Sequence, residues 1–216
     1  MTEKIAVLFD CDGVLVDSEP ALAQIAAEVL RARGLAARPE DFAPFIGTGE
    51  DTYIGEVVKM HGGKYVPEIK DEVYAAYIRE AGDYVKSFPG CLDLLAELKS
   101  AGVKTAVASS ADLIKVKANL KALGFSGFDA VISGSDIERK KPFPDIYLLA
   151  AERLGFDPSV CLVVEDATAG IEAGNRAGMT TIAFTSACSA SEMEAAGADY
   201  VAGSFSEIRE IIRKFY

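Results

Sequence analysis

Two carboxylates stand directly after the first apolar run of the chain, in a pattern that suits chemistry on a charged group. Asp10 and Asp12 follow the run 5–9 and have one residue between them. In extended chain, residues two apart point to the same side, so both carboxylates face one space and Cys11 faces away. Because two nearby carboxylates repel each other, a cation is expected beside them. A capping Asp and a loop Asp would give the same pattern without any chemistry.

Hydroxyl and cationic side chains follow the next two apolar runs. Ser109 and Ser110 come after the run 104–108, where they would hold a phosphate oxygen or cap the following helix. Lys141 comes after the run 130–132 and immediately before a proline. An ammonium placed there suits a transferring phosphoryl group, although such a lysine taken alone is more typical of solvated surface.

A second pair of acids follows the apolar run 160–164. Glu165 and Asp166 are costly to place there unless they meet a cation or a hydrogen-bond donor. Asp166 together with Asp10 would form an oxygen-rich site of the kind that Mg²⁺ prefers. The four groups together favour phosphoryl transfer. The chain has one histidine, His61, which we interpret as a surface or helix-end residue, so the candidate general acid is Asp12.

The elements that must position these groups alternate between strands and helices. Apolar runs typical of parallel strands covered on both faces are 5–9, 104–108, 130–132, 160–164 and 180–184. Helical patterns lie at 92–100, 112–123, 144–154 and 169–177. This alternation predicts an α/β fold with a doubly wound parallel sheet. Sites in such folds lie at the carboxyl ends of the strands, where the four groups stand.

One long stretch interrupts the alternation. Residues 18–88, 71 in number, contain no convincing strand. Helical patterns within it are 21–33, 51–60 and 68–81. We therefore expect a helical cap domain at 18–87, inserted into an α/β core of residues 1–17 plus 88–216. Linkers near 17–18 and 86–88 would let the cap open and close.

The cap contains candidates for substrate contact at Gly47, Thr48, Gly49 and Glu50. The two glycines would let main chain approach a ligand, and they are equally well explained as loop residues. The cap carries 12 acidic and 8 basic residues, so it is no clamp for a polyanion. This composition favours a small substrate with a single phosphate.

Composition excludes several classes of protein. The chain has 216 residues, of which 22 are Lys or Arg and 33 are Asp or Glu, giving a net charge of −11. That balance argues against partners such as nucleic acid or anionic lipid. No apolar run reaches the ~18 residues of a membrane span, and Asp10 and Asp12 end the first run too early for a signal peptide. The 4 cysteines have no metal-site spacing, so we expect reduced, mostly buried thiols in a cytoplasmic protein. We expect a monomer, because no conspicuous apolar stripe is left over for a partner.

The chain resembles the haloacid-dehalogenase superfamily of hydrolases, in the subgroup with a small helical cap that contains β-phosphoglucomutase and phosphoglycolate phosphatase. The likeness extends over essentially the whole chain. Its motifs, in order, are DCDGVLVDSE at 10–19, Ser109, Lys141-Pro142, and Glu165-Asp166 followed by Ala169-Gly170-Ile171. Four spaced motifs in one order are far more specific than any of them alone.

The resemblance implies a role for each matching position. Asp10 would be the nucleophile that forms an aspartyl-phosphate, and Asp12 would be the general acid and base. The implied ligands of Mg²⁺ are Asp10, the main-chain carbonyl of Asp12, Asp166, and Glu165 near or in the shell. The implied holders of the phosphoryl oxygens are Ser109, Ser110 and Lys141.

The resemblance thus implies a Mg²⁺-dependent phosphatase acting on a small phosphorylated metabolite, with a β-phosphoglucomutase-type mutase as the alternative. Leu22 and Glu50 stand where such mutases carry a histidine and an arginine, and an acid at the second position would repel a second phosphate. Two further alternatives are a phospho-receiver signalling domain and a catalytically inactive regulator. The 71-residue insert argues against the first and the intact motifs against the second.

Overall fold

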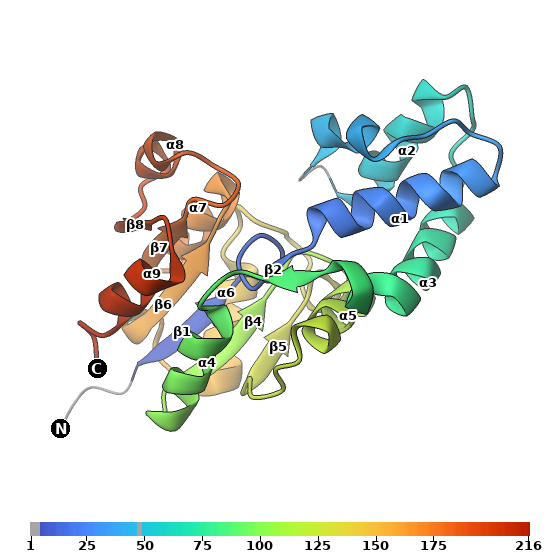
Figure 1. The fold of residues 1–216 in the computed structure, drawn as a ribbon. Coiled ribbons are helices and arrows are strands. Elements are labelled where there is room, and N and C mark those ends of the chain that lie inside the picture. Colours follow the sequence, from blue (N-terminus) through green and yellow to red (C-terminus); the bar gives the residue numbers. More distant parts are fainter. Residues whose placement is uncertain (1–4, 47–48) are drawn as a thin grey trace.

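The computed structural model describes residues 5–46 and 49–216. Within them the main sheet has six parallel strands in the order β5-β4-β1-β6-β7-β8 (Figure 1). These strands are β1 (Ala6–Phe9), β4 (Lys104–Ala108), β5 (Ala130–Ile132), β6 (Cys161–Glu165), β7 (Thr180–Phe184) and β8 (Tyr200–Ala202). The predicted doubly wound α/β fold is confirmed, and the first five of the strands in chain order match the predicted runs to within one residue.

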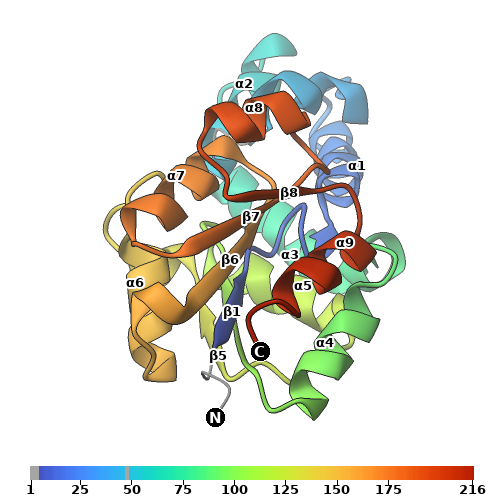
Figure 2. The ribbon, with the colours of Figure 1, turned by 90° about the vertical axis from the view of Figure 1, so that its left-hand side faces the viewer.

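Helices cover both faces of this sheet (Figure 2). One face carries α4 (Cys91–Ser100), α5 (Leu113–Leu123) and α9 (Phe205–Ile212), and the other carries α6 (Asp145–Leu154) and α7 (Thr168–Arg176). Alternate residues of β1 enter the two layers: Val7 and Phe9 belong to the first apolar cluster, and Ala6 and Leu8 to the second. Both layers exclude water from β1, so the residues at the carboxyl end of this strand are surrounded by protein.

A helical segment leaves the core after β2 (Val16–Asp17) and returns at β3 (Lys86–Ser87). It consists of α1 (Glu19–Ala32), the 3₁₀ helix η1 (Pro39–Phe45), α2 (Glu50–Met60) and α3 (Pro67–Tyr84). These elements lie beyond the carboxyl ends of the core strands (Figure 1). The three predicted helices are therefore confirmed, each within a few residues of its expected bounds.

The expectation that residues 18–88 hold no strand is wrong at Lys86–Ser87. There β3 pairs antiparallel with β2, with Val16 opposite Ser87 and Asp17 opposite Lys86. Strands of two residues leave no alternation that a sequence pattern can reveal. They form because the outgoing and returning chains run side by side at the base of the helical segment.

The last elements of the chain were not predicted from the sequence. These are α8 (Ala190–Ala195), β8 and α9, and the short 3₁₀ turns η2 (Gly134–Asp136) and η3 (Pro158–Val160) were not expected either. β8 has three residues, of which two are only half-buried, so its hydrophobic signal is weak. It is held by pairing with β7.

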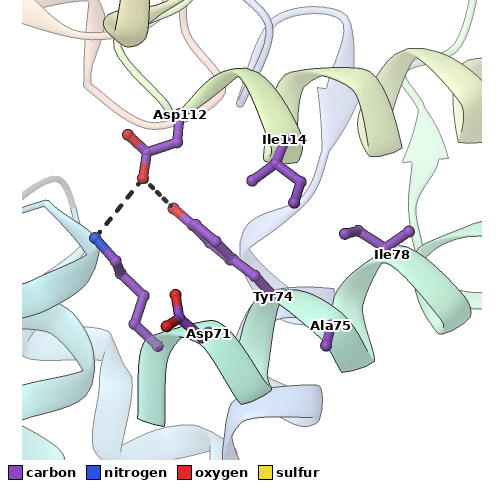
Figure 3. Close-up of a pocket in the computed structure, with 7 residues that line it drawn as sticks. Asp71, Tyr74, Ala75, Ile78, Asp112 and Ile114 are labelled. Atoms are coloured by element: carbon purple, nitrogen blue, oxygen red, sulfur yellow. Dashed lines mark hydrogen bonds and ion pairs between the residues drawn. The ribbon is translucent and has the colours of Figure 1, made fainter. Parts of the chain in front are cut away.

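The helical segment rests on the core through α3, which packs against α5. A groove of about 420 Å³ runs between these two helices (Figure 3). In it, the Tyr74 hydroxyl donates to Asp112 at 3.2 Å, and the Lys70 ammonium lies 3.8 Å from the same carboxylate. None of the residues expected to carry chemistry lines this groove, so it belongs to the junction between the helical segment and the core.

Three smaller expectations concern the cysteines, His61 and membrane spans. All four cysteines are free, and Cys188 alone is not fully buried. His61 ends α2, as expected, and its Nε2 lies 2.8 Å from Asp41. Across residues 5–46 and 49–216, no helix has the length and apolar character needed to cross a bilayer.

Candidate functional site

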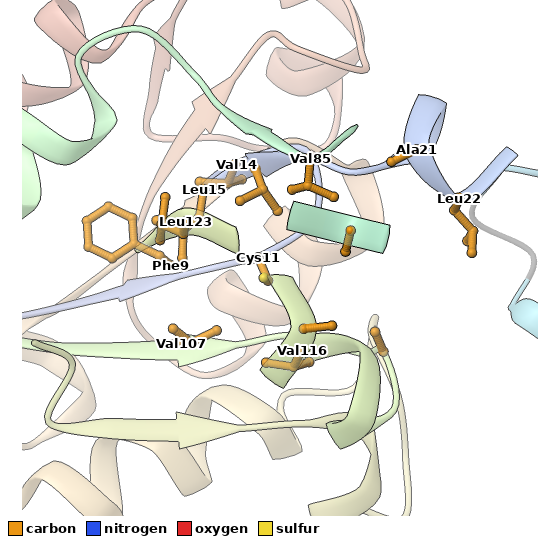
Figure 4. Close-up of a cluster of buried hydrophobic side chains, with 14 of the residues drawn as sticks. Phe9, Cys11, Val14, Leu15, Ala21, Leu22, Val85, Val107, Val116 and Leu123 are labelled. Atoms are coloured by element: carbon orange, nitrogen blue, oxygen red, sulfur yellow. The ribbon is translucent and has the colours of Figure 1, made fainter. Parts of the chain in front are cut away.

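Asp10 and Asp12 lie at the carboxyl end of β1, at the centre of the sheet. The amide of Asp10 donates to Val164 on the neighbouring strand at 3.0 Å, which fixes the main chain at this point. Cys11, between them, is fully buried and points into the apolar cluster between β1 and α5 (Figure 4). The alternation expected for extended chain therefore holds here, with the thiol buried and the two acids directed to the site.

Lys141 lies between the ends of three strands. Its ammonium donates to the carboxylates of Asp10 and Glu165 and to the carbonyl oxygen of Ala108, the last at 3.0 Å. The Lys141 side chain is 8% exposed, so this is a buried ion-pair cluster rather than a solvated lysine. The peptide bond between Lys141 and Pro142 is cis. The structure thus brings together the three residues that the sequence placed at separate strand ends.

Glu165 is buried, and its carboxylate holds the Lys141 ammonium in place. One of its carboxylate oxygens also accepts a hydrogen bond from the Tyr147 hydroxyl at 2.9 Å. The other accepts from the main-chain amides of Asp166 and Ala167, at 2.9 and 3.1 Å. Both oxygens are therefore engaged by the protein itself. Sequence reasoning missed Tyr147, whose only signal was a hydroxyl on the apolar face of the helix predicted at 144–154.

Gly170 packs against Glu165, whose carboxylate occupies the space that a side chain at position 170 would need. A Cβ at Gly170 would lie 1.9 Å from the Glu165 carboxylate, which its partners hold in place. We expect Gly170→Ala to destabilise the protein by about 1–3 kcal/mol, since overpacking a rigid site costs that much, and to lower any activity that uses Lys141. Urea unfolding measures the loss.

Gly82→Ala is the matched control for this substitution. Gly82 lies inside α3 with no atom within 4 Å of an added Cβ. We expect it to stabilise the protein by about 0.5–1 kcal/mol, because alanine favours a helix interior. Equal effects of the two substitutions would contradict the close packing of Gly170 against Glu165.

Asp166 completes the acidic side of the site. It is 7% exposed, and a Cβ at Gly13 would lie 1.9 Å from its carboxylate. Gly13 has φ +77°, a conformation that residues with a side chain rarely adopt. Ser186 links the two, since its hydroxyl donates to the Gly13 carbonyl at 2.6 Å and lies 3.4 Å from Asp166. Asp166 therefore sits directly against the loop that carries Asp12.

The acids of this cluster carry more negative charge than Lys141 can neutralise. Burial, together with the carboxylates of Glu165 and Asp12, raises the pKa of Asp10 to about 7 against the effect of Lys141. Burial and the carboxylates of Glu165 and Asp10 raise the pKa of Asp166 well above its usual value. Among the described residues, no three His, Cys, Asp or Glu side chains form a complete metal site. Two buried carboxylates with unneutralised charge suit a hard cation that retains water ligands.

Asp12 has a different environment, which the sequence did not reveal. One of its oxygens, Oδ1, accepts from the Ser18 hydroxyl and from Asn119 Nδ2 at 2.9 Å, and lies 3.1 Å from the Lys115 ammonium. Burial alone would raise the pKa of Asp12, but Lys115 and the hydrogen bonds lower it below its usual value. Lys115 and Asn119 stand four apart on the helix predicted after Ser109. That spacing was the available signal.

The two serines after β4 differ in their contacts. Ser109 is 2% exposed; its hydroxyl accepts from the Ala111 amide at 3.2 Å and lies 3.4 Å from Asp12. Asp112, not Ser109, immediately precedes α5, so Ser109 does not cap that helix. The Ser110 hydroxyl is buried and has no hydrogen-bond partner among the described residues.

Of the cap candidates, Glu50 lies close to the residues around Asp12. It begins α2, and its carboxylate lies 3.9 Å from the Lys115 ammonium. Gly49 is exposed and precedes the same helix. Gly47 and Thr48 lie outside the described residues.

The chain is similar in sequence to several known proteins. The family model for haloacid dehalogenase-like hydrolases matches residues 6–178. The chain is 43% identical over 201 residues to Protein SUPPRESSOR OF QUENCHING 1, chloroplastic, of Arabidopsis thaliana, covering 89% of this chain and 19% of that protein. It is 36% identical over 178 residues to Hexitol phosphatase A of Escherichia coli K12, covering 82% of this chain and 81% of that protein.

A solved structure shows the same fold over nearly the whole chain. The putative β-phosphoglucomutase from Thermotoga maritima superposes with a TM-score of 0.83 at 28% identity, covering 98% of this chain and 100% of that one. The family match and the relative named as a phosphatase agree with the predicted phosphoric monoester hydrolase. The predicted resemblance is confirmed: the chain belongs to the haloacid dehalogenase-like hydrolase family.

Proposed function

We propose that this protein is a divalent-metal-dependent phosphatase that hydrolyses a small phosphorylated metabolite through an aspartyl-phosphate on Asp10. The observation that carries the proposal is the buried ammonium of Lys141 held against the Asp10 carboxylate. A cation fixed beside a carboxylate nucleophile attracts the phosphoryl group to the atom that attacks it. Glu165 keeps that cation in place without competing as a nucleophile, because both its oxygens are engaged.

In the first step, a carboxylate oxygen of Asp10 attacks phosphorus. The bond from phosphorus to the leaving oxygen breaks, and that oxygen takes a proton from Asp12 to give the alcohol. Lys141, Ser109 and Ser110 hold the phosphoryl oxygens; the buried hydroxyl of Ser110 lacks any other partner among the described residues. The bound phosphoryl group adds negative charge beside Asp12, which favours the protonated form that this step needs.

In the second step, water attacks the phosphorus of the aspartyl-phosphate. Asp12 takes a proton from this water as the bond to Asp10 breaks, and phosphate and the free carboxylate are regenerated. The lowered pKa of Asp12, caused by Lys115 and its hydrogen bonds against the effect of burial, keeps it ionised between turnovers.

Asp10, Asp166 and the main-chain carbonyl of Asp12 would hold Mg²⁺. When bound, Mg²⁺ would neutralise charge on the nucleophile and on the phosphoryl group. The two carboxylates fit such an ion because both are buried and both have raised pKa values from burial and from neighbouring carboxylates. Glu165 would support the site through Lys141 rather than bind the ion, since its oxygens already accept four hydrogen bonds.

Residues 18–87 would form the cap that encloses the substrate. The acid Glu50 at its inner end disfavours a second anionic group on the substrate. This favours a monophosphate of a neutral polyol as the substrate. The name of the hexitol phosphatase relative implies substrates of that kind for that protein. The predictions of a monomer in the cytoplasm, and of no nucleic-acid or membrane partner, stay predictions.

Phosphate release from a panel of phosphorylated metabolites tests this proposal. The panel holds hexitol, hexose and pentose monophosphates, phosphoglycolate and β-glucose 1-phosphate, each with Mg²⁺ and with EDTA. We expect Mg²⁺-dependent release of phosphate that is fastest for monophosphates with no other charged group. No release from any member would overturn the proposal.

The alternative is a sugar-phosphate mutase, which the likeness to the Thermotoga maritima structure favours. The same panel separates the two functions. Disappearance of β-glucose 1-phosphate with no free phosphate would establish the mutase and would show that Glu50 does not exclude a second phosphate.

Magnesium is expected to stabilise the protein more at about pH 8 than at about pH 5.5. Burial raises the folded pKa of Asp10 to about 7 and that of Asp166 above its usual value. When the pKa of an acid is higher in the folded state than in the unfolded state, the metal-free protein loses stability as the pH rises. The loss begins near the unfolded pKa of ~4 and is complete above the folded pKa. Mg²⁺ binds the charged carboxylates and offsets this cost, so the increase in Tm should grow with pH.

Thermal unfolding with MgCl₂ or EDTA at the two pH values measures this effect. Asp166→Asn should reduce the increase in Tm that Mg²⁺ causes at the higher pH. Equal Mg²⁺ effects at both pH values would contradict binding by these buried acids.

A further inference from the structure

A buried lysine outside the predicted motifs joins the core to the helical segment. Lys115, on α5, is 4% exposed, and an ammonium so buried is costly unless carboxylates surround it. Three do: its Nζ lies 3.1 Å from Asp12, 3.8 Å from Glu19 and 3.9 Å from Glu50. Asp12 belongs to the core loop, whereas Glu19 and Glu50 begin α1 and α2 of the helical segment.

Asn119, one turn further along α5, makes the same kind of link through hydrogen bonds. Its amide nitrogen donates to Asp12 Oδ1 at 2.9 Å, and its amide oxygen accepts from the Tyr77 hydroxyl at 2.6 Å. Tyr77 lies on α3 and is fully buried. Because a hydroxyl donor faces the amide oxygen, the amide nitrogen is left to face Asp12. The hydrogen bond from Tyr77 on α3 thus determines that the Asn119 side chain presents its nitrogen, not its oxygen, to Asp12.

These contacts treat the two oxygens of Asp12 differently. Oδ1 is surrounded by Ser18, Lys115 and Asn119. Oδ2 has one hydrogen-bond partner among the described residues, the Ser109 hydroxyl at 3.4 Å, which is long for a hydrogen bond. The arrangement therefore holds one oxygen still and leaves the other available to exchange a proton with the substrate.

We propose that Lys115 and Asn119 are positioning residues through which docking of the helical segment on α5 orients Asp12 for proton transfer. This role rests on the proposed phosphatase function and adds a structural condition to it. When α1, α2 and α3 are docked (Figure 1), Glu19, Glu50 and Tyr77 hold the pair that in turn holds Asp12 Oδ1. Oδ2 then protonates the leaving oxygen as its bond to phosphorus breaks, and later accepts a proton from the attacking water.

The role of Asp12 as an acid gives a selective test. An alkyl phosphate needs a proton on its leaving oxygen, whereas p-nitrophenyl phosphate releases a stable anion that needs none. We expect Lys115→Met to lower kcat/KM for an alkyl phosphate on the order of 10²-fold and for p-nitrophenyl phosphate by less than about threefold. With the latter, a burst of nitrophenolate should precede a slow steady rate, because hydrolysis of the aspartyl-phosphate still needs Asp12 as a base.

Three further variants test whether the effect is specific to the charge of Lys115 and to its link with the helical segment. Lys117→Met is the control, because Lys117 is exposed on the same helix, and both substrates should react as with the wild type. Lys115→Arg keeps the charge and should recover part of the loss. Tyr77→Phe removes only the hydroxyl donor of the helical segment, and we expect the same selective loss at roughly tenfold.

An equal loss for both substrates, or no loss for either, would overturn the positioning role. If Lys115→Met does not fold, Tyr77→Phe decides in the same way, since it removes one oxygen atom from a packed ring. Failure of the proposed function is distinguishable: the wild type would then release no Mg²⁺-dependent phosphate from either substrate, and the positioning role would fall with it.

Discussion

Asp10→Asn is expected to abolish turnover while the protein stays folded. Asparagine has nearly the same shape as aspartate, but its amide cannot form the aspartyl-phosphate, so both steps lose their nucleophile. We expect a fall in kcat on the order of 10³-fold or more, comparable with the loss of other nucleophiles. The main chain at this position is held by the hydrogen bond to Val164, which the substitution leaves intact. Phosphate release under saturating substrate and Mg²⁺ gives kcat directly.

The control is Asp93→Asn, which removes an exposed carboxylate from the first turn of α4. It should turn over at the wild-type rate. Both variants should unfold near the wild-type temperature, which separates loss of chemistry from loss of fold. Residual activity of Asp10→Asn above a few percent of wild type would show that Asp10 is not the nucleophile.

Lys141→Met is expected to lose both activity and stability. Removing the ammonium leaves Asp10 and Glu165 buried, without the cation they share. Breaking a buried ion pair by deleting one partner costs about 3–5 kcal/mol, and the free energy of unfolding should fall by that amount. Activity should fall on the order of 10²–10³-fold, because the same ammonium holds the phosphoryl group. Urea unfolding and phosphate release measure the two effects.

The double variant Lys141→Met/Glu165→Gln separates these two roles. Glutamine removes the uncompensated charge while keeping most of the size of Glu165, so stability should recover in part and activity should not. Lys140→Met is the matched control, since Lys140 is exposed beside it, and its stability should stay within about 0.5 kcal/mol of wild type. Full recovery of activity in the double variant would contradict the role of Lys141 at the phosphoryl group.

Much of this site is readable from the chain because of the geometry of a parallel sheet. Asp10 and Lys141 are 131 positions apart, yet each follows an apolar strand, and the carboxyl ends of parallel strands meet at one edge. An apolar run is visible in sequence, and the polar residue that ends it is visible too. The convergence of Asp10 and Glu165 therefore required only that the strands be found, whereas Lys141 follows the end of its strand at a distance and is brought back by the intervening loop.

The contacts around Asp12 are not readable in the same way. Lys115 and Asn119 lie on the buried side of α5, where a sequence pattern shows two polar residues among apolar ones but not what they face. Their partners come from the loop after β1 and from three helices of the inserted segment. Which of these meet depends on the packing of α3 against α5, and helical periodicity carries no information on that packing.

The α/β fold, the helical insert and the residues at the strand ends could be predicted from the sequence, because burial on both faces imposes long apolar runs with abrupt polar ends. Two features became visible only in the folded protein. Glu165 accepts hydrogen bonds from Lys141, Tyr147 and main-chain amides, and α5 connects Asp12 to the insert. The physical reason is that buried charges must find partners, and the partners nearest in space lie on elements distant in the chain.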